Sequence, residues 1–178
     1  MRLMTTTVMI VSAGLLATGC TRDVETGSAT ADARTATAPL RTAAGADVGR
    51  ATATEVAGGI RYTIDARGLP AGTHGVHVHM VGRCDGPDFT TAGAHWNPSG
   101  RQHGTLNPQG PHSGDLPNLI TGADGRGTVG ITIAGATMDG LLDADGSTMM
   151  VHANADDLRT DPSGNSGGRI ACGVFQAG

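Results

Sequence analysis

Three of the seven histidines of this chain lie within six residues, in the segment His74–His79 (HGVHVH). Valine and histidine alternate from Val76 to His79, which is typical of a β-strand. Side chains two residues apart on a strand point to the same face, so the rings of His77 and His79 would lie side by side. Two such imidazoles can share one metal ion, although a pair of strand histidines can also simply face solvent.

Three further histidines and an aspartate lie in one long irregular segment: His95, His103, His112 and Asp115. Three imidazoles and a carboxylate form a ligand set suited to Zn²⁺, whose tetrahedral sites use nitrogen and oxygen donors. Closing such a site would contribute folding free energy to a loop that has no core of its own. His152 ends a later predicted strand, and the all-imidazole set of His77, His79 and His152 suits copper.

Alternation of apolar and polar residues predicts the strands that would position these ligands. The predicted strands are 35–41, 50–56, 60–66, 76–79, 127–133 and 148–152, and only 138–142 could hold a helical turn. The alternation stops between Met80 and Leu116, and a second irregular stretch runs from Ala153 to Gly168. Loops this long in a compact domain are usually either disordered or functional. We therefore expect an all-β sandwich or flattened barrel with its chemistry on two long loops.

The composition supports this fold class and argues against several others. The chain has 178 residues, enough for one domain with a core plus a leader and a tether. Glycine is abundant, with 29 residues, and aromatic residues make up only 2% of the chain, which favours short strands and many turns over a helical bundle. The formal charge is −4 and all 12 cationic side chains are arginines, so we expect no nucleic-acid partner.

The first 34 residues resemble an export signal followed by a tether. An apolar run from Val8 to Leu16 is too short to span a bilayer and is followed by small residues before Cys20. This predicts a lipoprotein-type signal peptide over residues 1–19 and lipidation of Cys20. A plain secretory peptide cleaved nearby, or a free Cys20 thiol, is the alternative. Residues 20–34 predict a flexible tether, and the folded domain is expected over residues 35–178.

Five ordered segments resemble the copper-zinc superoxide dismutases of the bacterial exported type: GTHGVHVHMVGRC, AGAHWNP, HSGDLPN, VHANADD and GGRIACGV. The resemblance extends from about residue 35 to the end of the chain. It implies a Greek-key β-sandwich, an architecture of which this enzyme family is itself an example. It also implies one copper and one zinc per chain, and superoxide as the substrate.

The resemblance assigns a role to each candidate residue. It implies copper ligands at His77, His79, His95 and His152, and zinc ligands at His95, His103, His112 and Asp115. His95 would bridge the two metals. Asp156 would hydrogen-bond one ligand of each metal, and His74 would have a structural role beside them. Arg169 would attract and orient the anion beside copper, so Arg169 and His95 are the expected catalytic residues.

The resemblance also bears on location and assembly. Cys84 and Cys172 would form a disulfide between the ligand loop and the last strand, which requires an oxidising compartment. Together with the leader, this predicts the periplasm or cell envelope, with the lipid on Cys20 as the link to a membrane. Exported relatives occur as monomers and as dimers, so a homodimer is a possible assembly.

Dismutation of superoxide needs a metal with two accessible oxidation states, which zinc lacks. The expected function is therefore conversion of superoxide to dioxygen and hydrogen peroxide at a histidine-bound copper, with a structural zinc. The alternative is an exported copper- or zinc-binding protein of the same fold that does not turn over. The segment 153–169 carries aspartates at 156, 157 and 161 and no lysine, so we expect weaker attraction of superoxide than in lysine-rich relatives.

Overall fold

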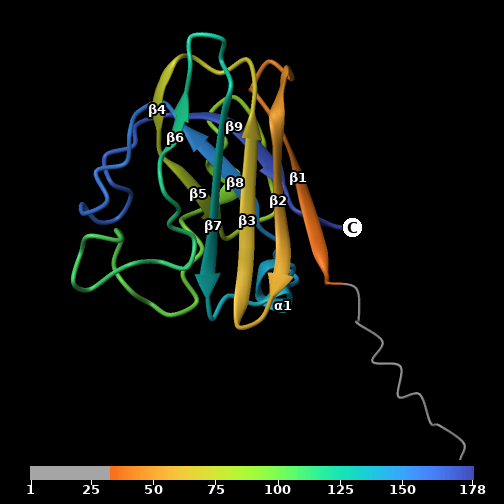
Figure 1. The fold of residues 1–178 in the computed structure, drawn as a ribbon, viewed down its shortest axis with the longest axis vertical. Coiled ribbons are helices and arrows are strands. Elements are labelled where there is room, and N and C mark those ends of the chain that lie inside the picture. The colour runs from red at the N-terminus through yellow and green to blue at the C-terminus, as the bar shows by residue number, and fades with distance from the viewer. Residues whose placement is uncertain (1–32) are drawn as a thin grey trace, which may run out of the picture. The chain divides into compact units, whose positions relative to one another are not determined.

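The structure is a computed structural model that describes residues 33–178, so the predicted signal peptide, Cys20 and most of the predicted tether lie outside the described residues. One curled antiparallel sheet contains eight strands, seven of them in the order β5-β8-β9-β1-β2-β3-β7 with β10 paired to β1 (Figure 1). These strands are β1 (Thr35–Arg41), β2 (Asp47–Val56), β3 (Gly59–Ala66), β5 (Val76–His79), β7 (Gly127–Ala134), β8 (Thr148–His152), β9 (Arg169–Val174) and β10 (Gln176–Ala177). A second sheet pairs β4 (Gly72–His74) with β6 (Leu119–Thr121).

Helical structure within residues 33–178 is confined to α1 (Met138–Leu141) and the 3-10 turn η1 (Thr90–Ala92). Thr137 caps α1, because its side chain accepts a hydrogen bond from the backbone N–H of Gly140. No helix in this part of the chain is long and apolar enough to cross a membrane.

The buried core residues of β1 and β2 are mostly alanines, whereas β3, which pairs with β2, contributes Ile60, Tyr62 and Ile64. Along β1, the buried side chains of Ala36 and Ala38 alternate with more exposed ones, and they pair with Ala53 and Ala51 of β2. This is the period of two that a strand imposes when one of its faces is buried. The alternation visible in the sequence therefore arises from burial of one face of the sheet.

Strands β5 and β8 are buried on both faces along their whole length. On β5, Val76 and Val78 join the main core, while His77 and His79 face the opposite way. On β8, Met149 and Val151 join the same core. Adjacent Met150 packs instead against a small cluster of Phe89, Ala92 and Cys172. The two methionines thus fill apolar space on opposite faces of one strand.

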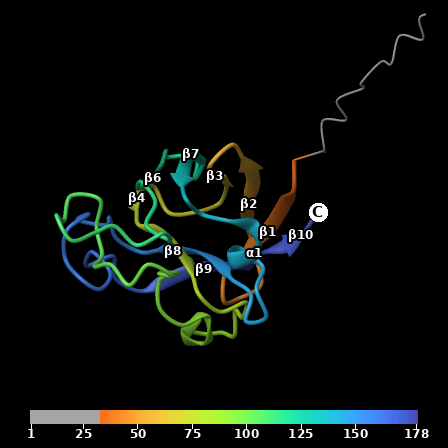
Figure 2. The same ribbon diagram turned by 90° about the horizontal axis from the view of Figure 1, so that it is seen from below.

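Both predicted long loops are present and both cover the histidine face of β5 and β8. The first, residues 80–118, contains only η1 and two isolated bridges, and the second, residues 153–168, contains no strand or helix. Figures 1 and 2 show the two loops, in green and blue, on the same side of the sheet. A disulfide between Cys84 and Cys172 joins the first loop to β9.

Alternation identified six strands and the helical turn, but it missed β4, β6, β9 and β10. Strands β4 and β6 have three residues each and β10 has two, which is too short to display a period. On β9, Ala171, Cys172 and Gly173 are buried one after another, so no alternation exists to be read. The all-β fold class is confirmed.

Candidate metal centre

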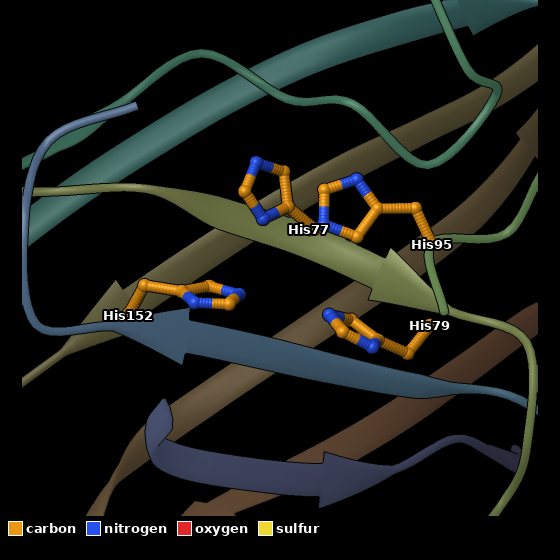
Figure 3. A group of neighbouring side chains, drawn as sticks. All are labelled: His77, His79, His95 and His152. Atoms are coloured by element: carbon orange, nitrogen blue, oxygen red, sulfur yellow. The ribbon is translucent and has the colours of Figure 1, made fainter. Parts of the chain in front are cut away.

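Four buried histidines from three parts of the chain converge on one point (Figure 3). His77 and His79 come from β5, His152 comes from the end of β8, and His95 comes from the first long loop. The pairing of β5 with β8 and an isolated bridge between His79 and His95 bring them together. One ring nitrogen of each histidine lies within 4.8 Å of the chosen nitrogens of the other three.

The nitrogens that face this point have no hydrogen-bond partner. Four of the six buried and unpaired side-chain N or O atoms found in the described residues belong to this group: His77 Nδ1, His79 Nε2, His95 Nε2 and His152 Nε2. Three of the rings instead use their other nitrogen as a donor: His77 Nε2 to Asp156 Oδ2 (2.8 Å), His79 Nδ1 to the Gly93 carbonyl (2.9 Å) and His152 Nδ1 to the Gly167 carbonyl (3.2 Å).

These outer hydrogen bonds set the tautomer of each ring, because the nitrogen that donates carries the proton and the other keeps its lone pair. Unpaired buried polar atoms are rare and costly. Four inward-facing lone pairs in one place therefore require a cation, and four imidazole donors suit copper. The residues present fit this metal.

Burial keeps three of these rings neutral. Loss of hydration lowers the pKa of His77 to about 4, that of His79 to about 2 and that of His152 to about 3. A histidine must be neutral to bind a metal. At neutral pH these rings are therefore ready to bind without first releasing a proton.

A second group of donors surrounds the carboxylate of Asp115. Its Oδ1 lies 3.0 Å from His95 Nδ1, 2.9 Å from His103 Nδ1 and 3.3 Å from His112 Nδ1. His112 Nδ1 is also 3.4 Å from His95 Nδ1. Donors at Zn–N distances of about 2.0 Å in a tetrahedron lie about 3.3 Å apart, so this spacing fits zinc.

His77 also lies within 4.8 Å of His95, His103 and Asp115, which makes it a rival to His112 as the fourth member of this second group. Its two nitrogens are, however, already committed. His77 Nδ1 belongs to the first group, and Nε2 donates to Asp156. His112 is therefore the better fourth donor, and His95 faces the first group with Nε2 and the second with Nδ1.

The second group is strongly coupled by charge. Burial opposes ionisation of both Asp115 and His103, but the hydrogen bonds between them outweigh it. The pKa of Asp115 is lowered, and that of His103 is raised to about 9 with help from Asp156. In the metal-free chain a proton on His103 therefore supplies positive charge between two carboxylates, where zinc would supply it.

Asp156 joins the two groups through one carboxylate. Its Oδ2 accepts from His77 Nε2, and its Oδ1 accepts from His103 Nε2 at 3.0 Å. Hydrogen bonds of this kind orient metal ligands and raise their basicity. His74 has a different position, because its ring lies between two backbone carbonyls, 2.8 Å from that of His152 and 3.0 Å from that of Pro70. It thus steadies the backbone at His152.

A cavity of about 400 Å³ opens onto the first group. Its lining residues are His79, Gly93, Ala94, His95, His152, Pro162, Ser163, Gly167 and Arg169. The Arg169 guanidinium donates to the carbonyls of Phe89 (2.6 Å) and Gly93 (2.7 Å). Burial lowers the pKa of Arg169, but a guanidinium keeps its charge at any physiological pH. The cavity therefore presents one positive charge beside the histidines.

The sequence profile of the copper/zinc superoxide dismutase (SODC) family matches residues 48–175. This chain belongs to that family. A Cu-Zn superoxide dismutase of Caulobacter vibrioides is 43% identical over 148 residues, which cover 79% of this chain and 85% of that protein. A second one, from Aquifex aeolicus, is 38% identical over 137 residues, covering 72% of this chain and 79% of that protein.

Solved structures of similar proteins share the fold. A SOD-like protein from Bacillus subtilis has a TM-score of 0.74 and 39% identity, covering 79% of this chain and 97% of that one. The Cu/Zn superoxide dismutase from Brucella abortus has a TM-score of 0.64 and 29% identity, covering 80% of this chain and 99% of that one. The predicted β-sandwich of this family is confirmed, as are the two metals, copper and zinc.

Several groups that support the centre were not predicted from the sequence. The carbonyls of Gly93 and Gly167 orient two of the histidines, and Phe89 helps hold Arg169. Asn118 is also involved, because its side chain exchanges two hydrogen bonds with the backbone of Asp156. A backbone carbonyl carries no residue-type signal. For Asn118, whose side chain is involved, the only sequence signal is the resemblance of the segment HSGDLPN, which ends at this residue.

Proposed function

We propose that this member of the copper/zinc superoxide dismutase family catalyses 2 O₂⁻ + 2 H⁺ → O₂ + H₂O₂ in the arginine-lined cavity. One observation carries the proposal: four buried, unpaired imidazole nitrogens converge where the cavity meets Arg169. Copper, when bound, would supply one-electron redox chemistry between its two oxidation states. His77, His79, His95 and His152 would be its ligands.

The chain's own residues would supply attraction, orientation and a proton. The Arg169 charge attracts the anion into the cavity, and the carbonyls of Phe89 and Gly93 hold the guanidinium in one orientation. His95 lines the same cavity, and its Nε2, once released from copper, could take up a proton from solvent and pass it to the reduced substrate. Its Nδ1 stays among the zinc donors, so the ring keeps its place while the proton moves.

The zinc donors would have a structural task. His103, His112 and Asp115 belong to the first long loop, which has few core residues of its own, and binding zinc would hold that loop against β5. Asp156 would keep one ligand of each metal in position. The site thus separates the redox metal from the metal that fixes its surroundings.

The test is the decay of superoxide, followed by stopped flow, with protein loaded with copper and zinc and with zinc alone. Rapid decay that consumes many superoxide ions per copper supports the dismutase. Decay no faster than in the zinc-only protein, with copper shown to be bound, would instead indicate a copper- and zinc-binding protein without turnover. The zinc-only control tests this alternative function, which is relevant because the chain is also similar to a SOD-like protein.

We also propose export to the periplasm or cell envelope, with a lipid on Cys20. The disulfide between Cys84 and Cys172 supports an oxidising compartment. Mass spectrometry of the N-terminal peptide from cells tests the lipid: an unmodified Cys20, or cleavage elsewhere, would exclude it. Sedimentation of the purified protein at several concentrations tests for the homodimer.

A further inference from the structure

The two long loops are attached to each other around the zinc donors. Leu106 N–H donates to the carbonyl of Leu158 (2.9 Å), and the Arg159 guanidinium donates to the carbonyl of Leu106 (3.3 Å). The Asn107 side chain donates to the carbonyl of Arg159 (3.3 Å). These bonds join residues more than fifty positions apart. The segment 153–168 therefore forms part of the support of the zinc site.

Close packing leaves no space for side chains at this contact. Gly104 has φ +107°, and a Cβ there would overlap the backbone carbonyl of Leu158. Gly164 has φ +63°, and a Cβ there would overlap the Asp156 carboxylate and come within 2.7 Å of His103 Nε2. Both glycines are therefore needed for the close approach as well as for their positive φ.

Asp161 lies where this contact reaches the zinc donors. Its Oδ1 accepts a hydrogen bond of 2.6 Å from the backbone N–H of His103. The same oxygen is 3.9 Å from His112 Nε2, which is too long for a direct hydrogen bond, and burial lowers the pKa of His112, so the carboxylate lies beside a neutral ring. One carboxylate oxygen thus binds the backbone of one zinc donor, His103, and lies near the ring of another, His112, nine residues further along the chain.

Asp156 and Asp161 contact different parts of the two donor groups. Asp156 is buried and holds the side chains of His77 and His103, so it serves both groups of donors. The side chain of Asp161 is 47% exposed. Among the metal donors of the described residues, it contacts only His103 and His112. A role confined to zinc therefore follows for Asp161.

We propose that Asp161 is a positioning residue for zinc: its hydrogen bond fixes the backbone of His103, so that this zinc donor is held in place before the metal arrives. It does not bind the metal itself. Because its carboxylate is half exposed, its effect belongs at the low end of the range for groups that orient metal ligands, about tenfold in affinity. This inference rests on the proposed zinc ligands.

The experiment measures zinc affinity of the metal-free protein by competition with a chromophoric chelator. Asp161→Ala removes the hydrogen bond and the charge, whereas Asp161→Asn keeps an oxygen that can accept from His103 N–H. We expect Asp161→Ala to raise the Kd for zinc about tenfold and Asp161→Asn to raise it less. Copper affinity of the zinc-loaded protein should change less than twofold in both variants.

Asp157→Ala is the matched control. Asp157 lies in the same loop and accepts hydrogen bonds only within it, from Arg159, Thr160 and Asn165. If order of the loop were all that mattered, Asp157→Ala would weaken zinc binding as much as Asp161→Ala, and the proposal would be overturned. A change of less than twofold in Asp161→Ala, or an equal loss of copper affinity, would overturn it as well.

The outcomes for the unmodified protein keep this inference separate from the function on which it rests. If the unmodified chain does not bind one zinc, the assignment of the zinc donors fails. If it binds zinc and Asp161→Ala binds it equally well, only the role of Asp161 fails. Superoxide turnover is not needed for either result.

Discussion

Breaking the disulfide between Cys84 and Cys172 should cost more stability than any single hydrogen bond in the protein. The two cysteines are 88 residues apart, so the bond closes about half of the chain into one loop. The chain-entropy relation for a loop of that length gives about 4.6 kcal/mol at 25 °C, because the cross-link restricts the unfolded chain. This is a large part of the total stability of an ordinary domain.

The assay is urea unfolding of the metal-free protein, in its oxidised form and as the double variant Cys84→Ala, Cys172→Ala. The variant also removes two sulfur atoms, one of them buried, so a packing loss adds to the entropic one. Unmodified protein held reduced by a thiol-free reductant is the control, since it loses the cross-link and keeps both sulfurs. The reduced protein should lose about the entropic amount, and the double variant should lose more by the packing term.

The bond should affect the site as well. It anchors the loop that supplies the Phe89 and Gly93 carbonyls to Arg169, and Cys172 is three residues beyond Arg169 on β9. Reduction should therefore lower metal retention, and it should slow turnover in protein that still holds copper. A loss of less than about 1 kcal/mol in reduced protein, with unchanged metal content, would refute this account of the disulfide.

Three further predictions concern charge, burial and pH. Arg169→Ala should lower kcat/KM for superoxide about tenfold at low salt, and kcat/KM should then decrease less with added salt, as measured by stopped flow. Arg169→Lys should give intermediate values. Equal salt dependence in the unmodified protein and both variants would contradict electrostatic attraction of superoxide by Arg169. Tyr62 is fully buried, its hydroxyl has no hydrogen-bond partner, and burial raises its pKa. Tyr62→Phe should therefore raise the free energy of unfolding, measured in urea, by about 1 kcal/mol. A lower free energy of unfolding would show that the hydroxyl has a partner. The metal-free protein should lose stability as the pH falls below about 6.5 toward 4, because burial lowers the pKa of three rings in the folded state: His77, His79 and His152. The sign follows because the unfolded chain takes up protons in this range and the folded chain does not, and equal urea midpoints at pH 7 and pH 5 would contradict it.

Much of the site could be predicted because strand geometry is regular. Alternation from Val76 to His79 is enough to place two histidines on one face and two valines on the other, and β5 has this arrangement. The long interruption after Met80 likewise indicated a functional loop, and the loop holds four donors. These inferences need only the period of a strand and the chemistry of imidazole.

Other features could not be predicted because they depend on how distant segments meet. The contact between Asp161 and His103 crosses 58 residues, and no local pattern reports it. The same holds for the ring nitrogens: each histidine offers two, and the partner of one decides which remains free. Those partners include the carbonyls of Gly93 and Gly167, whose positions are set by the course of two irregular loops.

By itself, the sequence determined the residue types that can bind copper and zinc, the strands that alternate and the two loops that do not, because these follow from side-chain chemistry and local backbone geometry. The family resemblance pointed to His95, Asp156 and Arg169, but the tertiary structure alone decided which ring nitrogen of each histidine remains free and that Asp161 meets the backbone of His103. The physical reason is that a metal centre needs donors close together in space, and only the packing of β5, β8 and the loops brings donors from residues 77 to 152 within 4.8 Å of one another.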